Sequence, residues 1–220
     1  MDERLSAAAR LFPKVHLGAD IGANHGLLAC ELLATRKAEH MWLTDLSEDA
    51  LEHARRNIAS RGLSERASFA VGDGFSVLPE KVEAAAILGM GGQTIAQILR
   101  SAPCDLLPDC LIISAHTEQE FVRKVLYEQS YTIRQEEIAF SAGRYYILEL
   151  AVRDSDIQAQ TDRSLFLGPC LTECSTPIYR KYLEHRLAAY QPSRTEEGIR
   201  RYQWLREEAA RAAADSSRSL

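Results

Sequence analysis

The sequence predicts an α/β protein whose largely parallel sheet ends in an antiparallel hairpin and is followed by a pair of helices. Short apolar runs alternate with amphipathic stretches of helical length from Val15 to about Arg153, as in consecutive strand–helix units. Two strand-like runs near the end of that stretch are joined almost directly. Beyond a polar segment, apolar residues recur at helical spacing.

The apolar runs predict five strands in order along the chain. We expect them near Val15–Asp20, His40–Thr44, Ala67–Val71, Ala84–Leu88 and Leu111–Ser114. Helices fill the intervals between them. The clearest is Ser47–Arg61, in which Ser47 can cap the first turn and Gly62 can end the last. Further helices are expected over Gln93–Arg100 and from near Thr117.

The next two strands are predicted to form a hairpin. Tyr131–Phe140 and Arg144–Arg153 are separated only by Ser141–Gly143, and so short a link forces an antiparallel pair. A parallel sheet finished by such a hairpin is typical of Rossmann-like, class I methyltransferases and unusual in nicotinamide dehydrogenases. We therefore predict a first domain over residues 1–153.

A polar linker, Asp154–Arg163, precedes a second domain that is predicted over residues 164–220. Its first helix begins near Thr176 and Pro177, since proline suits a first turn. A second helix follows Pro192, where Ser193 and Glu196 can form a capping box. Apolar residues recur on one side of each helix: Tyr179, Leu183, Leu187 and Tyr190 on the first, and Tyr202, Leu205, Ala209 and Ala212 on the second. Two such stripes joined by a short turn predict an antiparallel, coiled-coil-like helical hairpin.

Composition restricts the partners of the protein. The formal net charge of −5 argues against indiscriminate binding to nucleic acid, but residues 178–220 hold nine lysines and arginines against six acidic residues. The five cysteines lack the spacing to other ligands that would predict a metal site. No run of about 20 apolar residues predicts a membrane span. We expect a cytoplasmic protein without a metal, and the sequence leaves its oligomeric state open, a monomer included.

The first strand leads into a loop that could bind a cofactor. The loop residues Asp20, Gly22, Asn24, His25 and Gly26 compare with an acidic-x-Gly-x-Gly-x-Gly pattern, in which glycines let the backbone curl beneath a ligand. Asn replaces the middle glycine, which is acceptable because Asn tolerates a left-handed conformation. His25 could orient the cofactor or cap the following helix.

Two more acidic corners follow in register. Asp45, followed by Leu46, ends the second strand, where its carboxylate can accept hydrogen bonds from two ribose hydroxyls. Asp73 and Gly74 end the third strand, where the carboxylate can accept from an adenine amino group. The loop lacks the Gly-x-Gly-x-x-Gly spacing that holds a pyrophosphate. These corners therefore favour S-adenosylmethionine, which has no phosphate, over a dinucleotide.

A glycine-rich corner after the fourth strand is the predicted substrate side. Gly89, Met90, Gly91 and Gly92 would let the backbone approach a flat substrate closely, and Gly89 could contact the cofactor as well. His116, after the fifth strand, is the candidate for contacting the edge of the substrate base. The alternative for the glycines is a plain tight turn.

These motifs together resemble a bacterial family that methylates N1 of adenine 22 in tRNA. The specific part of the resemblance is Gly89–Gly92 together with the run Leu167–Leu171, and it extends over nearly the whole chain. The family has Asp-His-Ala-Tyr-Leu-Pro where this chain has Asn24–Ala29, and Gln-Pro-Asn where this chain has Ser114–His116. Both departures lie on the expected substrate side.

The resemblance implies an S-adenosylmethionine-dependent methyltransferase that holds tRNA with its basic C-terminal helices. The implied phosphate-binding residues are Arg180, Lys181, Arg186, Arg194, Arg200 and Arg201. Two alternatives stay open: a methyltransferase for another RNA site or a small molecule, and an RNA-binding protein that keeps the cofactor without turnover. A nicotinamide dehydrogenase comes last.

Overall fold

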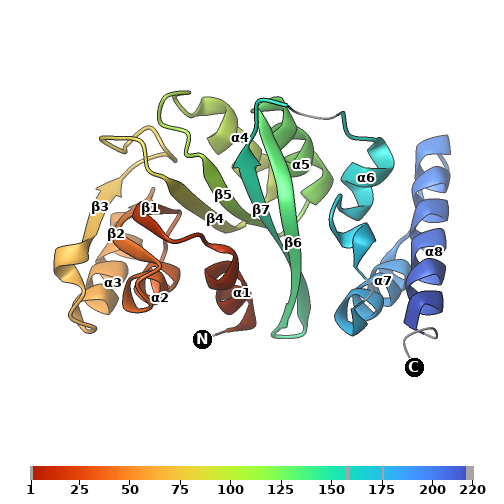
Figure 1. Cartoon of the computed structure of the whole chain (residues 1–220), viewed down its shortest axis with the longest axis horizontal. Coiled ribbons are helices and arrows are strands. Elements are labelled where there is room, and N and C mark those ends of the chain that lie inside the picture. Colours follow the sequence, from red (N-terminus) through yellow and green to blue (C-terminus); the bar gives the residue numbers. More distant parts are fainter. Residues whose placement is uncertain (1, 157–158, 175, 217–220) are drawn as a thin grey trace. The chain divides into compact units, whose positions relative to one another are not determined.

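The computed structural model describes residues 2–156, 159–174 and 176–216, and the chain divides into two compact units, Met1–Ile157 and Gln158–Leu220. The first unit is built on a seven-stranded sheet in the order β3-β2-β1-β4-β5-β7-β6 (Figure 1). Its strands are β1 (Val15–Ile21), β2 (Ala38–Asp45), β3 (Ala67–Val71), β4 (Ala84–Met90), β5 (Cys110–Ala115), β6 (Tyr131–Ser141) and β7 (Arg144–Arg153). The strands β1 to β5 pair in parallel, and β7 is antiparallel to both its neighbours. The predicted sheet is confirmed.

Helices cover both faces of the sheet. On one face lie α1 (Glu3–Leu11), α2 (Leu27–Ala34) and α3 (Glu48–Ala59), and on the other α4 (Gly92–Ser101) and α5 (Gln119–Glu128) (Figure 1). The strand order reverses direction between β1 and β4, because the chain moves outward one way through β2 and β3 and the other way through β5. Such a reversal leaves a crevice at the carboxyl ends of the two central strands, where ligands bind in open α/β sheets.

The local sequence explains the termini of α3. Ser47 accepts a hydrogen bond from the backbone N–H of Ala50, and acidic residues occupy the first turn. The buried residues are Leu51, Ala54 and Ile58, as the helical spacing predicts. The helix ends at Ala59, two residues before the predicted end, and Gly62 follows with φ +68.

The hairpin of β6 and β7 is confirmed, but its turn is shorter than predicted. The strands continue through Ser141 and from Arg144, so the link is two residues, Ala142 and Gly143. Both have positive φ, +48 and +76, which is the backbone that a two-residue hairpin turn requires.

Helix α1 is absent from the sequence predictions. The Asp2 side chain caps it by accepting from the backbone N–H groups of Arg4 and Leu5. The helix packs on β6, β7 and α2 through small residues such as Ala7 and Ala8, which are fully buried. The sequence does hold signals for this helix: Asp2 as a cap, Glu3 in the first turn and Arg10 in the last turn. The apolar side of the helix is mostly alanine, however, and therefore gives only a weak hydrophobic pattern.

The second unit contains α6 (Asp162–Leu167), a short 3-10 turn (Leu171–Glu173), α7 (Pro177–Ala189) and α8 (Glu196–Ser216). The predicted linker, Asp154–Arg163, is therefore too long at its end, because α6 begins at Asp162 with Thr161 as its cap. Residues 157–158 of that linker are outside the part of the chain that the structure describes. The predicted end of the second domain, at residue 220, also lies outside the described residues, which stop at 216. Thr176 caps α7 as expected.

Two contacts, the first of them buried, fix the direction of α7 against α8. The Tyr179 hydroxyl, near the start of α7, donates to Glu208 in the second half of α8 at 3.0 Å. Tyr190, just beyond α7, stacks on Tyr202 near the start of α8, with ring centroids 6.2 Å apart. The helices are therefore antiparallel, as predicted. The cap of α8 was predicted wrongly: Thr195, rather than Ser193, accepts from Gly198 N–H, and Ser193 bonds the Thr195 hydroxyl instead.

No helix among the described residues is both long and apolar enough to cross a membrane.

Candidate active site

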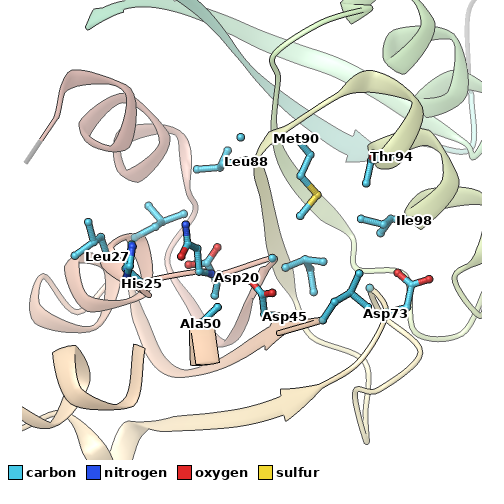
Figure 2. A pocket seen from close by; sticks show the side chains of 18 of the residues that line it. Asp20, His25, Leu27, Asp45, Ala50, Asp73, Leu88, Met90, Thr94 and Ile98 are labelled. Atoms are coloured by element: carbon cyan, nitrogen blue, oxygen red, sulfur yellow. Dashed lines mark hydrogen bonds between the residues drawn. The ribbon is translucent and has the colours of Figure 1, made fainter. Parts of the chain in front are cut away.

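A cavity of about 610 Å³ opens at the carboxyl ends of β1, β2, β3 and β4, the size of an ordinary small-molecule site. Figure 2 shows Asp20, Asp45 and Asp73 along one side of it, with Met90, Thr94 and Ile98 on the other. The predicted residues that line it are Asp20, Gly22, Asn24, His25, Asp45, Leu46, Asp73, Gly74, Gly89, Met90 and His116. Three strand ends far apart in sequence therefore meet at one cavity.

The loop after β1 curls onto the end of β2. The Thr44 carbonyl accepts from the backbone N–H groups of Gly22 and Ala23, at 2.8 and 2.9 Å. Gly22 has φ +70 and Asn24 has φ +49, so the middle position of the loop does adopt the left-handed conformation expected of Asn. The Asn24 N–H then points at Asp45, and donates to its Oδ2 at 3.0 Å.

The three carboxylates differ in their surroundings. Asp45 is held by two backbone donors, since Ser47 N–H also donates to its Oδ1 at 3.0 Å. Asp73 is exposed. Asp20 is 5% exposed, and its burial raises its pKa to about 7; the Ala29 backbone N–H lowers that pKa and the charge of Asp45 raises it. This end of the cavity therefore concentrates acceptors for hydroxyl, amino and cationic groups.

A bulge in β4 shapes the opposite wall. The pairing with β5 shifts between Leu88 and Met90, which leaves Gly89 as the extra residue with φ +79. A Cβ built on Gly89 would lie 3.2 Å from an Arg4 guanidinium nitrogen and 3.8 Å from His116 Nε2. The bulge therefore brings bare backbone to the place where Arg4 and His116 converge.

Met90 reaches across the cavity toward the first loop. A Cβ on Gly22 would lie 1.9 Å from the terminal methyl of Met90. A side chain at Gly22 would therefore have to displace the flexible end of Met90, and the positive φ of Gly22 disfavours one in any case.

Three predicted glycines lie outside the cavity. Gly26 packs against Leu43 and Ala54, where its φ of +64 begins α2. Gly92 is buried against the backbone of residues 117–118, so it permits close packing of α4 beside the start of α5. A Cβ on Gly91 would meet only the Thr117 hydroxyl, at an ordinary 3.5 Å. Of the predicted substrate-side residues Gly89–Gly92, only Gly89 and Met90 therefore line the cavity.

His25 lines the cavity but does not cap α2, whose N-cap, Gly26, makes no side-chain bond. The imidazole instead lies edge-on to His53, with ring centroids 5.3 Å apart.

Comparison with known proteins assigns the chain to a family. The family model for tRNA (adenine(22)-N(1))-methyltransferases matches residues 18–212. The chain belongs to this family. It is 27% identical over 201 residues to the tRNA (adenine(22)-N(1))-methyltransferase of Bacillus subtilis (strain 168). The matched region covers 87% of this chain and 84% of that protein. The prediction of an S-adenosylmethionine-dependent methyltransferase of the tRNA adenine-N1 type is confirmed.

Solved structures of similar proteins share the fold. The B. subtilis m1A22 tRNA methyltransferase superposes with a TM-score of 0.76 at 23% identity, over 97% of both chains. TrmK from M. capricolum, in complex with S-adenosyl-homocysteine, superposes with a TM-score of 0.83 at 20% identity, over 96% of this chain and 98% of that one. The Rossmann-like methyltransferase fold predicted from the sequence is thereby confirmed.

The cavity of this family member also contains residues that sequence reasoning missed. They include Arg4, Leu5, Ile21, Leu27, Leu28, Leu88, Thr94 and Ile98. Most are apolar walls supplied by helices rather than by strand ends, so no motif marks them. Arg4 comes from α1, and nothing in its local sequence indicates that this helix reaches the cavity.

The cationic residues expected to bind RNA lie in the second unit, in different surroundings. Lys181, Arg194 and Arg200 are exposed. Arg186 is half-buried, donates to the Phe166 carbonyl at 2.9 Å and lies 4.1 Å from the centroid of its ring. Arg201 pairs with Glu197 at 2.6 Å, and Arg180 is half-buried. The exposed three are the members of this set that present their charge most fully to solvent.

Within the described part of the chain, no cluster of three or more His, Cys, Asp and Glu side chains could hold a metal ion.

Proposed function

We propose that this protein transfers the methyl group of S-adenosylmethionine to N1 of adenine 22 in tRNA, using the strand-end carboxylates for the cofactor and the Gly89 bulge for the base. The observation that carries the proposal is the convergence of Asp20, Asp45 and Asp73 on one cavity whose opposite wall includes the β4 bulge at Gly89. When bound, the cofactor supplies an electrophilic methyl group on a sulfonium.

The cavity suits that cofactor. Gly22 and Gly89 both have positive φ, so the backbone lines the cavity where side chains would fill it. Asp45, fixed by its two backbone donors, is oriented to accept from a ribose diol. Leu46 is 73% exposed at the cavity, where it can cover an adenine face, and Asp73 can accept from an adenine amino group. Asp20 places a carboxylate where a cation would be stabilised.

The residues on the substrate side position the base and do little acid–base chemistry. Adenine N1 has an in-plane lone pair, so alignment supplies most of the catalysis, roughly 7–11 kcal/mol in favourable cases. His116 can bond the base edge. Partial burial, Arg4 and Arg144 lower the pKa of His116, which favours the neutral imidazole. A neutral ring adds no positive charge beside a base that becomes cationic as it is methylated.

Binding of the tRNA would draw on the basic second unit. Lys181, Arg194 and Arg200 are available for phosphate contacts, and Arg180 and Arg201 could join them. Such contacts would offset the few kcal/mol needed to expose a base from folded RNA. A tRNA substrate also supports the cytoplasmic location that the sequence predicts.

The test is nucleoside mass spectrometry of unmodified tRNA incubated with the protein and S-adenosylmethionine. We expect 1-methyladenosine, and none in a matched tRNA whose adenine 22 is replaced by guanine. Methylation that survives this replacement would indicate another RNA site. Tight cofactor binding with no methyl transfer to any RNA would indicate a protein that has kept only binding, and methylation of a metabolite extract alone would indicate a small-molecule substrate.

A further inference from the structure

Arg4 reaches the cavity from the first turn of α1, outside every motif that predicts the site. Its backbone N–H is held by the Asp2 cap at 2.7 Å, and the next residue, Leu5, also lines the cavity. Since α1 packs on β6 and β7, the backbone of Arg4 is held in place beside the cavity.

The guanidinium of Arg4 has unused hydrogen-bonding capacity. Its Nε is buried and makes no hydrogen bond to any described residue. Among the described residues, Asp2 forms a loose ion pair with it: Asp2 Oδ2 lies 4.0 Å from Nε, while Asp2 Oδ1 accepts from the backbone N–H groups of Arg4 and Leu5. A buried donor is costly to leave unpaired, and the Arg4 side chain, which is 23% exposed, also lines the cavity, so this arrangement fits a residue that awaits an anion.

Aromatic side chains hold the guanidinium in place. It lies 5.3 Å from the centroid of the Tyr146 ring, and Tyr146 lies 5.9 Å from the His116 ring. Arg4 and His116 both approach the bare backbone of Gly89. A cation, two rings and an exposed backbone segment therefore surround one corner, which has the features that bind a flat base joined to an anionic group.

We propose that Arg4, which lies against Tyr146, binds the phosphate of the target nucleotide while its base lies on the cavity side of His116 and Gly89. This inference rests on the proposed function, and it names a residue that positions the substrate for that reaction. Charge supports it: the Arg4 guanidinium, whose ion pair with Asp2 is 4.0 Å long, would repel a base that becomes cationic on methylation, whereas a phosphate on Arg4 neutralises that repulsion. The other anion within reach of this cavity is the cofactor carboxylate, which the experiment distinguishes.

The test compares Arg4→Gln and Arg4→Lys with the wild type in the full chain. A matched control is Arg36→Gln, which removes the same charge at an exposed position between α2 and β2. This position lies at the amino end of β2, whereas the site lies at the carboxyl ends of the strands. Three quantities are measured: KM and kcat for tRNA, the Kd for S-adenosylmethionine by calorimetry, and the melting temperature as a control for folding.

We expect Arg4→Gln to raise the KM for tRNA about tenfold to a hundredfold, the loss of one charge-assisted hydrogen bond, with the cofactor Kd within twofold of wild type. The KM of Arg4→Lys for tRNA should lie between those of the wild type and Arg4→Gln, since an ammonium keeps the positive charge but lacks the paired N–H donors of a guanidinium. A raised Kd for S-adenosylmethionine in Arg4→Gln with an unchanged KM for tRNA would overturn the inference, because it would show that Arg4 binds the carboxylate of the cofactor. Equal values for Arg4→Gln and Arg36→Gln would overturn it outright. If the wild type transfers no methyl to tRNA, the proposed function fails as well.

Discussion

Asp45 is oriented before any ligand binds, because Asn24 and Ser47 donate to its two carboxylate oxygens. We expect Asp45→Ala to weaken S-adenosylmethionine binding by about 1.5–3 kcal/mol, the value of a charged acceptor. Asp45→Asn, which keeps the shape and one oxygen, should lose less. Isothermal titration calorimetry measures both, and equal affinity in wild type and Asp45→Ala would remove this residue from the site.

Asp20 predicts a pH dependence of cofactor binding. Burial raises its pKa to about 7, and a bound cation favours the ionised form. As the pH falls through 7 the carboxyl takes up a proton, so cofactor affinity should fall, by at most tenfold per pH unit. In Asp20→Asn the affinity should be low, and this fall below pH 7 should be absent. Calorimetry between pH 5.5 and 8.5 checks this; a wild type with flat affinity would show that Asp20 does not sense the ligand.

The contribution of each residue to the site was predictable to different extents. Asp20, Asp45 and Asp73 could be predicted because a strand end is a local feature, and parallel strands bring their carboxyl ends together. The separate functions of Gly89 and Gly92 could not, because a register shift against β5 decides which of them faces the cavity. Arg4 could not be predicted either, since its position depends on how α1 packs against strands far along the chain.

At the scale of elements, one buried charge cluster joins α5 to the terminal hairpin. Arg123 donates at 2.7 Å to Glu149 and at 2.7 Å to Glu136, and these two glutamates are direct cross-strand neighbours on β7 and β6. All three side chains are nearly or fully buried. Two carboxylates facing each other are destabilising without the cation between them.

The cluster predicts how stability depends on pH. Burial raises the pKa of Glu149 above its ordinary value, Arg123 lowers it and Glu136 raises it, to about 7 in all. A raised pKa in the folded state means that stability is full below the unfolded value near 4.5 and is lost as pH rises through 7. We expect the urea midpoint of the wild type to fall over this range, and that of Glu149→Gln to fall less.

Removing the cation from the same cluster gives a second, larger effect. Arg123→Met would leave two buried carboxylates unpaired and should cost about 3–5 kcal/mol of unfolding free energy. The loss should be smaller at pH 5, where a carboxyl can protonate. Urea unfolding at pH 5 and pH 8 measures it, and an equal loss at both would contradict the assignment.

Short or alanine-rich elements limit what the sequence predicts at this scale. The alternating runs of β6 and β7 and the capped helix α3 were predicted because each carries a periodic pattern over ten or more residues. The six-residue helix α6 is too short to show a period, and its first two residues fell within the predicted polar linker. The two-residue turn at Ala142 and Gly143 fell inside the three residues expected for a loop.

At the scale of the whole molecule, charge is divided unevenly along the chain. Residues 1–177 hold 17 lysines and arginines against 25 acidic residues, whereas residues 178–220 have the basic excess. We expect replacement of Lys181, Arg194 and Arg200 by Gln to weaken tRNA binding and to reduce the slope of log affinity against log salt by close to one unit per lost contact. Binding titrations at several salt concentrations measure this.

Cofactor affinity is the internal control for that variant, because all the proposed cofactor residues lie in the first unit. An unchanged slope together with undiminished tRNA affinity would return the second unit to a packing or assembly role.

The docking of α1 on β6 and β7 ties the beginning of the chain to segments made more than a hundred residues later. Arg10, for example, bonds Glu137. At ribosomal rates of ~5–20 residues per second, α1 leaves the ribosome roughly 5 to 25 seconds before its partner strands exist. Arg4 can therefore reach the cavity only when synthesis of the sheet is complete. A nascent chain that already has the strand-end carboxylates still lacks this corner, and a prematurely released fragment would be left with an apolar face of α1 uncovered.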